Sequence, residues 1–308
     1  MPAESWSHDG GDATDFPRGL YCPVRAMPTV ALIITTYNRP VALDRVLDSV
    51  ARQQSMPEQV IIADDGSDAR TTAVVGAWQG RLGAPLSHAW QPDDGFRAAA
   101  SRNRAAREAG TDLLVFIDGD CLLRPCVVAE HRRLAEAGCA VAGNRILLSQ
   151  RLTAAVEQGA ADPVDWGMRE WARARLAGDV ERLSPLITLP GQRWRRLRPR
   201  HWLQVRSCNL AVARADFERV NGFEEEMTGW GFEDSDLAIR LINAGVKVKS
   251  GRFATAVLHL WHHERARDDA ERNRQRALAA RRQGVVLATL GLRQRPAGER
   301  FDPPVADA

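Results

Sequence analysis

The feature that most constrains the fold of this chain is an apolar run that ends in two aspartates. Residues 113–117 are Leu, Leu, Val, Phe and Ile, and Asp118, Gly119 and Asp120 follow directly. An unbroken apolar run rich in β-forming residues predicts a strand buried on both faces, which is typical of a parallel sheet. Such a strand ends at the carboxyl edge of the sheet, where open α/β folds bind ligands. The run therefore predicts an α/β fold with a polar site at residues 118–120.

The two aspartates also suggest what the site binds. Their side chains repel each other unless a cation lies between them, and oxygen ligands suit Mg²⁺ or Mn²⁺. Gly119 lets the backbone turn and lets a ligand approach closely. Taken alone, the tripeptide is explained equally well by an ordinary Asx turn at the end of a strand.

Two earlier apolar runs end in polar residues in the same way. Residues 29–36, which include Thr35, lead into Tyr37 and Arg39, and residues 59–63 lead into Asp64 and Asp65. Between the two runs, residues 40–50 follow a helical period that begins with a proline. Strand, helix and strand in this order predict a right-handed parallel crossover, so the polar ends should meet at one edge.

The next segments continue the alternation. We expect strands near residues 86–90 and 140–148, and helices near 71–79, 98–106 and 126–137. The start of the helix at 98–106 places Arg97 and Arg102 near the same sheet edge, where they could bind phosphates. A solvated, arginine-bearing helix face is the other interpretation.

Residues 150–206 differ from the rest because they show no clear strand signal. Six arginines and no acidic residue lie between residues 193 and 206, together with Trp194 and Trp202. Such a segment could bind an anionic acceptor or a membrane surface. It could equally be a solvated loop whose tryptophans anchor it to the core.

A second cluster of chemistry-bearing residues lies after residue 206. A strand is expected at 208–213 and a helix at 216–220, and then Gly-Trp-Gly, containing Trp230, leads into Glu233, Asp234 and Asp236 before a helix at 237–243. These acids could simply cap the helix. A later strand ends in His259, and His262 follows three residues on, a spacing that requires a turn if both are to face one ligand.

Composition excludes several classes of protein. The chain has 308 residues, 44% hydrophobic and 26% charged, as in a soluble globular protein. The net charge of +3 is too small to imply nucleic acid as the partner, and no apolar run reaches the 18 residues of a membrane span. Five cysteines without a CxxC pair predict reduced thiols and a cytoplasmic location.

The motifs, taken together and in order, resemble a known family. Ile-Ile-Thr-Thr-Tyr-Asn-Arg-Pro, Asp-Asp-Gly-Ser and Phe-Ile-Asp-Gly-Asp are similar to the nucleotide-sugar half of family 2 glycosyltransferases of GT-A fold. The segment from Asn-Leu-Ala-Val-Ala to Gly-Trp-Gly-Phe-Glu-Asp-Ser-Asp resembles the acceptor-side region of β-1,4-galactosyltransferases and chondroitin-type polymerases. The resemblance covers residues 28–265. It implies a Rossmann-like, mostly parallel sheet flanked by helices, with a contiguous C-terminal acceptor-side region.

The resemblance implies a donor site. Asp120, His259 and His262 would hold Mn²⁺ (or Mg²⁺) against the diphosphate of a nucleotide-sugar, with Asp118 bound through water or to the ribose. Asp65 would read a uracil-type base. The other donor contacts would be Thr35, Tyr37, Arg39, Asp64, Arg97 and Arg102.

The resemblance also implies how the reaction proceeds. An acceptor hydroxyl has a high pKa and must lose its proton as it attacks, so a carboxylate base is needed. Asp234 matches the position of that base, and Trp230, Glu233 and Asp236 would shape the acceptor site. A single in-line displacement would give a β-linked product from an α-linked donor.

Two departures from the family leave the substrates open. Animal galactosyltransferases have Gly at the position of Phe232 and Met at that of His259. The expected acceptor is a glycan or lipid-linked glycan, as in bacterial surface polysaccharide or lipopolysaccharide synthesis, with peripheral attachment to the membrane. The oligomeric state is open.

The expected organisation is a single GT-A domain with flanking segments. Residues 1–27 would form a flexible tail, 28–150 the nucleotide-sugar half, 151–265 the acceptor and metal-completing half, and 266–308 a C-terminal helix and tail. The alternatives are a non-catalytic sugar-nucleotide or glycan-binding protein on the same fold and, more distantly, a metal-dependent phosphotransferase. A dinucleotide-binding oxidoreductase is disfavoured because no GxGxxG follows the first strand.

Overall fold

The computed structural model describes residues 27–263, 268–294 and 301–305. The predicted flexible tail at residues 1–27 lies outside this part of the chain, except for Met27. Parts of the predicted C-terminal tail lie outside it as well.

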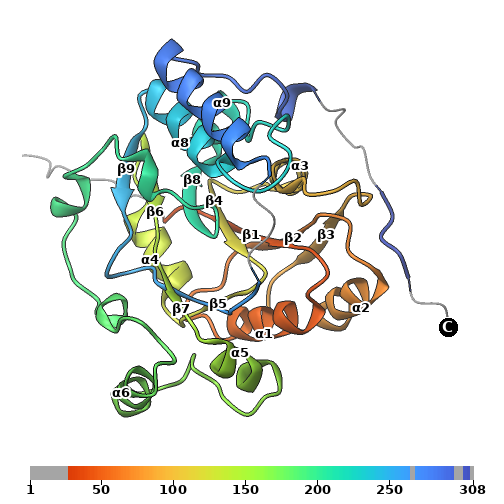
Figure 1. Ribbon diagram of the computed structural model, residues 1–308, viewed down its shortest axis with the longest axis vertical. Helices are drawn as coiled ribbons and strands as arrows, with labels where there is room; N and C mark the ends of the chain where they lie inside the picture. Colours follow the sequence, from red (N-terminus) through yellow and green to blue (C-terminus); the bar gives the residue numbers. More distant parts are fainter. Residues whose placement is uncertain (1–26, 264–267, 295–300, 306–308) are drawn as a thin grey trace, which may run out of the picture.

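A seven-stranded sheet forms the centre of the molecule (Figure 1). Its order is β3-β2-β1-β4-β8-β6-β9, so the strand that leads to Asp118 is the middle one, as predicted. Neighbouring strands of the sheet pair in parallel, except that β8 runs antiparallel to both β4 and β6. The strands are β1 Val30–Thr36, β2 Gln59–Asp64, β3 Leu86–Trp90, β4 Leu113–Asp118, β6 Cys139–Ala142, β8 Asn209–Ala213 and β9 Lys247–Ser250.

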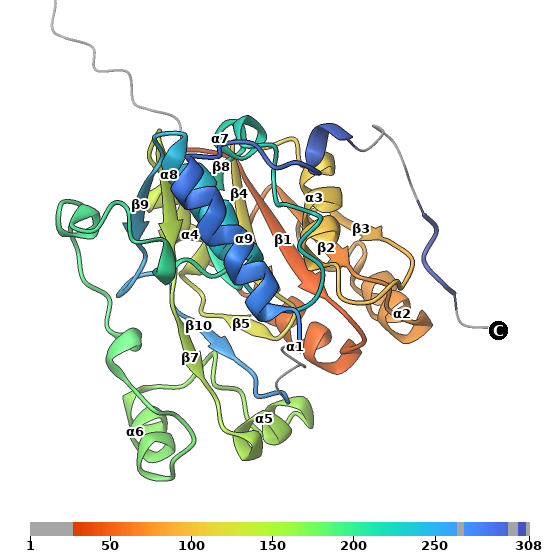
Figure 2. The same cartoon turned by 45° about the horizontal axis from the view of Figure 1, so that its top comes forward.

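Helices cover both faces of this sheet because its strands are apolar on both sides (Figure 2). Alternate residues of β1 pack into two hydrophobic cores, one on each face of the sheet. Leu32 lies in the core beneath α1, α2 and α4, and Ile33 lies in the core on the opposite face. The first set of helices is α1 Pro40–Ala51, α2 Ala69–Trp78 and α4 Val127–Leu134. On the opposite face lie α3 Ala98–Glu108, α7 Arg214–Arg219 and α8 Glu233–Asn243, and α9 Ala270–Gln283 packs on α8.

A smaller sheet brings together distant parts of the chain. Its order is β5-β10-β7, where β5 is Cys121–Leu123, β10 is Val257–His259 and β7 is Arg145–Leu147. The single strand predicted near residues 140–148 is therefore wrong, because β6 and β7 belong to different sheets. The chain crosses between them at Gly143, where a Cβ atom would lie 2.2 Å from the side chain of Asn209.

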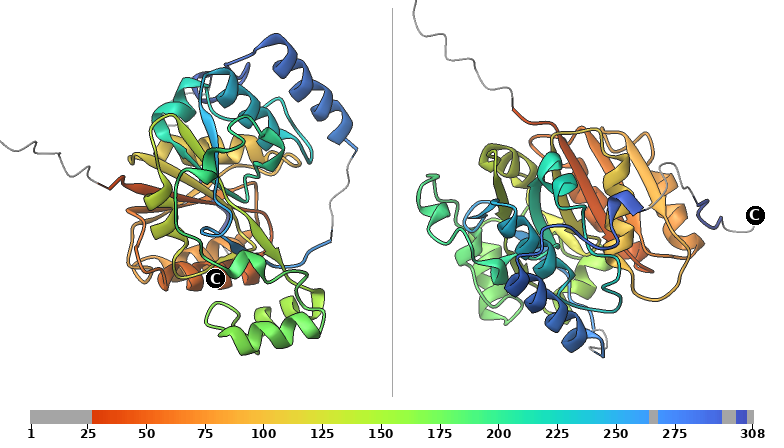
Figure 3. Two further views of the ribbon diagram at one scale, coloured as in Figure 1. Left: turned by 90° about the vertical axis from the view of Figure 1, so that its left-hand side faces the viewer. Right: turned by 90° about the horizontal axis from the view of Figure 1, so that it is seen from above.

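The segment from residue 150 to 206 contains helices and turns. As predicted, residues 150–206, all of which the structure describes, contain no β-strand. They form α5 Gln150–Glu157, α6 Met168–Leu176 and short 3₁₀ turns at Ser184–Leu186, Trp194–Arg196 and Trp202–Gln204. Figure 3 shows α5 and α6 at the end of the molecule opposite to α9.

Within the described residues, no helix is both long enough and apolar enough to cross a membrane.

Candidate active site

Asp120, His259 and His262 come together although His259 follows Asp120 by 139 positions in the sequence. One ligand atom from each lies within 4.8 Å of the others. Backbone pairing explains the approach: His259, the last residue of β10, pairs with Cys121, and the Leu260 N–H donates to the carbonyl of Asp120. The Trp261 N–H then donates to Thr153 Oγ1. The strand has ended by this point, and the ring centroids of His259 and His262 lie 5.2 Å apart.

The electrostatic state of His259 suits a metal ligand. Burial lowers the pKa of His259 to about 4, while the charge of Asp120 opposes that shift. The imidazole is therefore neutral at pH 7 and keeps a lone pair for coordination. Two imidazoles and a carboxylate form a set of ligands that suits Mn²⁺ or another first-row divalent ion better than Ca²⁺.

Arg39 lies against the same carboxylate. Its Nη1 donates to Asp120 Oδ2 at 2.9 Å and its Nη2 donates to Glu157 Oε1 at 2.9 Å. A metal ion at Asp120 would have to share this oxygen or displace the guanidinium. Glu157, which orients Arg39 from α5, was not predicted because no motif surrounds it in the sequence.

Arg102 joins the two halves of the site. Its guanidinium is buried and donates to Asp118 Oδ1 and Glu233 Oε1, each at 3.2 Å, and to Thr35 Oγ1 at 3.0 Å. All nitrogens of the Arg102 guanidinium contact protein groups in this structure. Arg102 neutralises Asp118 at the end of β4 and Glu233 at the start of α8. The contact of Arg102 with a phosphate stays a prediction.

Asp65 lies at the end of β2 in the position expected of a base-reading residue. Its two oxygens accept hydrogen bonds from Gln91 Nε2 at 2.7 Å and from the Arg97 backbone N–H at 2.8 Å. Burial raises the pKa of Asp65 to about 6, against the effect of these hydrogen bonds. Gln91 was not among the predicted residues.

Asp64 does not face the site. It is fully buried, and its oxygens accept from the Ser67 backbone N–H and contact His88 Nε2, each at 2.8 Å. In this structure Asp64 stabilises the loop that presents Asp65. Its donor contact stays a prediction.

Tyr37 and Arg97 both contact the loop at residues 91–95. The Tyr37 hydroxyl donates to Asp93 Oδ2 at 2.8 Å. The Arg97 side chain donates to the Pro92 carbonyl at 2.7 Å and pairs with Asp94 at 3.2 Å. These contacts fix the loop beside Asp65, although they do not direct the Arg97 guanidinium to Asp118 or Asp120.

The acids that follow the Gly-Trp-Gly turn have separate environments. Asp234 is half-buried in the first turn of α8, and the hydroxyl of Ser235 donates to it at 3.2 Å. Burial and the neighbouring Glu233 raise the pKa of Asp234 to about 6, whereas Arg206 and Arg102 act to lower it. Asp234 is thus largely ionised at pH 7 but holds a proton more readily than a surface aspartate.

Asp236 lies inside the protein. Its Oδ2 accepts from Arg240 Nε at 2.7 Å, and both side chains are buried. Asp236 follows Asp234 by two residues and so lies on a different side of the helix, which directs it to the core while Asp234 stays accessible. The acceptor contact of Asp236 stays a prediction.

A cavity of about 510 Å³ lies beside Trp230, whose side chain is exposed. The cavity lies between the loop after β3 and the turn before α8. These two segments are joined by a hydrogen bond from the Gly229 N–H to the Phe96 carbonyl at 3.0 Å. The residues that line the cavity are Asp94, Gly95, Phe96, Thr228, Gly229, Trp230, Asp268 and Asp269.

The arginines between residues 193 and 206 divide into structural and exposed groups. Arg195 is buried and its guanidinium donates to backbone carbonyls, among them those of Leu189 and Ser250. Arg196 pairs with Glu136. The interpretation that this segment binds an anionic acceptor stays a prediction, while Arg195 and Arg196 both have partners within the protein. Arg206 is different because its charge reaches Asp234.

Two protein-family models match the chain. "Glycosyl transferase family 2" matches residues 31–173, and "N-terminal domain of galactosyltransferase" matches residues 197–264. The predicted resemblance to both groups is confirmed, with the two regions in the predicted order.

Curated relatives agree with these models. The chain is 34% identical over 236 residues to a validoxylamine A glucosyltransferase of Streptomyces hygroscopicus subsp. limoneus, covering 73% of this chain and 50% of that protein. It is 27% identical over 245 residues to the chondroitin synthase of Pasteurella multocida, covering 72% of this chain and 24% of that protein. The chain thus spans half the length of the first relative and less of the second.

A solved structure shows the same fold. GalNAc-T7 with UDP, GalNAc and Mn²⁺ is similar with a TM-score of 0.55 and 13% identity, over 83% of this chain and 48% of that one. The expectation of a GT-A fold is confirmed.

Proposed function

We propose that this chain, which carries a family 2 glycosyltransferase domain followed by a galactosyltransferase-like region, is a metal-dependent inverting transferase of nucleotide-sugars. The observation that carries the proposal is the cluster of Asp120, His259 and His262 at the same sheet edge as Asp65 and Asp118. A UDP-linked donor is favoured, in line with the UDP bound to the similar GalNAc-T7 structure.

The residues of the cluster fit a divalent cation by their chemistry. His259 is neutral at pH 7, and Asp120 supplies an anionic oxygen. The ion would offset the negative charge that develops on the leaving diphosphate. Asp118 forms an ion pair with Arg102. From this position its carboxylate would bind the ribose or a water molecule on the metal.

Asp234 would act as the base. It lies at the start of α8, and the Arg102–Glu233 pair links that turn directly to Asp118 on the donor side. A pKa near 6 leaves the carboxylate ionised at pH 7 and able to accept a proton from an attacking hydroxyl. The exposed face of Trp230 and its cavity would hold an acceptor sugar by stacking on the apolar side of the ring.

The acceptor would be a glycan or lipid-linked glycan of a bacterial polysaccharide pathway. A relative of this chain is a chondroitin synthase and another is a glucosyltransferase. Peripheral contact with a membrane and a cytoplasmic location both stay predictions.

A donor screen tests the proposal. The purified protein would be incubated with Mn²⁺ and a panel of UDP- and GDP-sugars, and the released nucleoside diphosphate measured. We expect one donor to be hydrolysed well above the others, and both EDTA and Asp120→Asn to abolish release. Asp165→Asn is the matched control, since Asp165 is exposed and pairs only with Arg52. If no donor is turned over by the folded protein, the chain is a binding protein on a transferase fold.

A further inference from the structure

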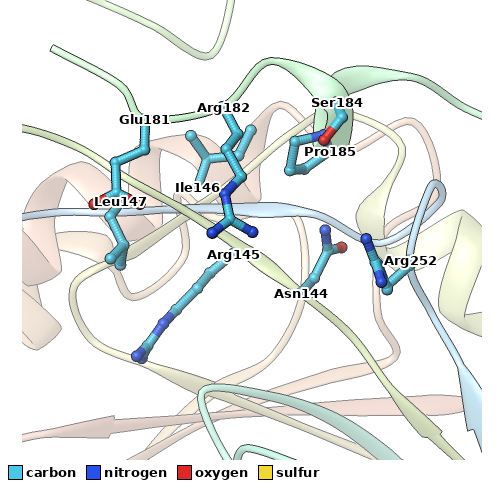
Figure 4. Close-up of a pocket in the computed structure, with 9 residues that line it drawn as sticks. All are labelled: Asn144, Arg145, Ile146, Leu147, Glu181, Arg182, Ser184, Pro185 and Arg252. Carbon is cyan, nitrogen blue, oxygen red and sulfur yellow. The ribbon is translucent and has the colours of Figure 1, made fainter. Parts of the chain in front are cut away.

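A second cavity, of about 320 Å³, lies outside the residues assigned above (Figure 4). It is bounded on one side by β7 and on the other by the segment after residue 180. Its size is sufficient for one monosaccharide. The lining residues are Asn144, Arg145, Ile146, Leu147, Glu181, Arg182, Ser184, Pro185 and Arg252.

The residues that line this cavity carry a net positive charge. They include three arginines and one glutamate, and none of these four forms a salt bridge within the part of the chain that the structure describes. Among the described residues, the Arg182 side chain has no hydrogen-bond or ion-pair partner, and the Arg252 guanidinium lies over the ring of Phe253. By contrast, the arginines of the donor site, Arg39 and Arg102, each bind two carboxylates.

The cavity adjoins the metal-ligand strand. β7 is the edge strand of the small sheet and pairs in parallel with β10, with Leu147 opposite His259 and Arg145 opposite Val257. Arg145 is two residues before Leu147, the partner of His259. Two residues along a strand span about 7 Å, so the backbone of Arg145 is offset from that of His259 by about this distance along the strand direction. Residues two apart share a face, so Arg145 lies on the same face as His259.

Arg145 connects the cavity to the donor edge. Its side chain extends away from Arg182 and Arg252 in Figure 4, and its Nη1 contacts the sulfur of Cys208 at 3.5 Å. Its charge acts on both Asp118 and His259. A ligand in the cavity would therefore lie between two free arginines and a third that faces the reacting groups.

We infer that this cavity is a subsite for an acidic sugar residue of the acceptor, whose carboxylate or phosphate is bound by Arg182 and Arg252. The inference rests on the proposed function, because it assigns the chemistry of the acceptor. Guanidinium groups bind these two anions through paired hydrogen bonds, and Arg182 and Arg252 have no ion pair with a described residue that the anion would have to displace. Ser184 and Asn144 add neutral polar groups for the sugar hydroxyls.

Binding of matched probes to the full chain tests this inference. Glucose, glucuronic acid and glucose 6-phosphate share one ring and differ in charge, and ligand-observed NMR would measure their affinities. We expect the two acids to bind and glucose to bind at least about 10-fold more weakly, a difference of about 1.4 kcal/mol. Arg182→Ala/Arg252→Ala should remove that preference. Glu181→Gln should strengthen the acids about two- to fivefold, the size of one partly screened charge contact.

The controls separate the subsite from the fold and from the donor site. Arg173→Ala/Arg175→Ala changes two exposed arginines of α6 outside the cavity and should leave the affinities unchanged. Mn²⁺-dependent donor hydrolysis, measured on the same samples, should survive Arg182→Ala/Arg252→Ala. Acid binding without any donor turnover would contradict the proposed function and not the subsite.

Three results would overturn the inference. The first is equal affinity for glucose and the acids, and the second is an acid preference that persists in Arg182→Ala/Arg252→Ala. The third is inorganic phosphate that binds as tightly as glucose 6-phosphate, since the cavity would then recognise a free ion and no sugar.

Discussion

Arg102 shows how single side chains set the electrostatics of this site. It is buried and pairs with Asp118 and Glu233, which come from opposite halves of the chain. Burial disfavours the charge of Arg102, while the carboxylates of Asp118 and Glu233 favour it and raise its pKa. Arg39 and Asp120 form a similar pair at the metal cluster. Asp118, Glu233 and Asp120 are thus each paired with an arginine in this structure.

Removal of Arg102 should therefore destabilise the fold. Arg102→Met keeps much of the volume but leaves two carboxylates without their cation. We expect a loss of about 3 kcal/mol in the free energy of unfolding, measured in urea, because breaking a buried pair leaves uncompensated charge. Arg70→Met, at an exposed pair with Asp68, is the control and should cause no resolvable change. Equal behaviour of the two variants would contradict the role given to Arg102.

Asp234 is the residue on which catalysis should depend. Asp234→Asn keeps the shape but cannot accept a proton, so kcat should fall by at least about 10²-fold. The rate of the wild-type protein at saturating donor should fall as the pH drops through about 6, because the raised pKa of Asp234 makes the carboxylate protonate there. The measurement is a steady-state pH profile of sugar transfer.

The neighbouring acids provide the comparison for that prediction. Asp236→Asn should act mainly on stability through the lost pair with Arg240, and Glu233→Gln should weaken the contact with Arg102. Near wild-type transfer by Asp234→Asn, with a large loss in either of the others, would show that the base is wrongly assigned.

At the scale of elements, the turn before α8 depends on its backbone. Gly229, Gly231 and Phe232 all have positive φ, and a left-handed residue at the N-cap is unusual for phenylalanine. This turn lets α8 begin at Glu233, with Asp234 half-buried and Asp236 inside. The sequence predicted a helix here. The difference in burial between Asp234 and Asp236 depends on the residue at which the helix begins, which the sequence pattern did not predict.

Gly229→Ala tests this dependence. A Cβ atom at Gly229 would lie 2.2 Å from Asp269 Oδ2, and φ is +74°. We expect a loss of at least about 1 kcal/mol in unfolding free energy and weaker acceptor binding, because the turn must shift. Gly76→Ala, in α2 with open space around it, should instead stabilise by about 0.5–1 kcal/mol. The same effect from both substitutions would show that the turn tolerates a side chain.

The elements differ in how well the sequence predicts them. β1, β2 and β4 were predicted because long apolar runs have no other stable place than the middle of a sheet. β9 was missed because its sequence is Lys-Val-Lys-Ser, and Lys249 is buried only because Glu136 and the Leu134 carbonyl bind its ammonium group. Such partners are supplied by tertiary structure.

The candidate site follows the same division. Asp118, Asp120, His259 and Asp65 were predictable because each lies where an apolar strand ends. No such sequence pattern precedes three other residues of the site, and only their contacts in the structure identify them: Glu157, Gln91 and Arg145.

At the scale of the whole molecule, the two halves share one sheet. β8 from the second half inserts between β4 and β6, and β9 completes the edge. The predicted boundary at residue 150 therefore does not divide the sheet. The separation of donor and acceptor functions at this boundary stays a prediction.

A fragment of residues 28–150 should consequently not fold by itself. β6 would lose both of its partners, β8 and β9, and the opposite face of the sheet would lose α7 and α8. We expect no cooperative thermal transition by circular dichroism, whereas the full chain should show one. A cooperative fragment would mean that the first half is an independent domain.

The account depends most on the metal cluster, and UDP binding measured by calorimetry tests it directly. With Mn²⁺ present, UDP should bind at least about 10-fold more tightly than in EDTA, because the ion links the diphosphate to Asp120, His259 and His262. In His259→Ala/His262→Ala this enhancement should disappear while the affinity in EDTA stays unchanged. UDP binding that is the same with Mn²⁺ and with EDTA, or an enhancement that survives the double substitution, would contradict the account.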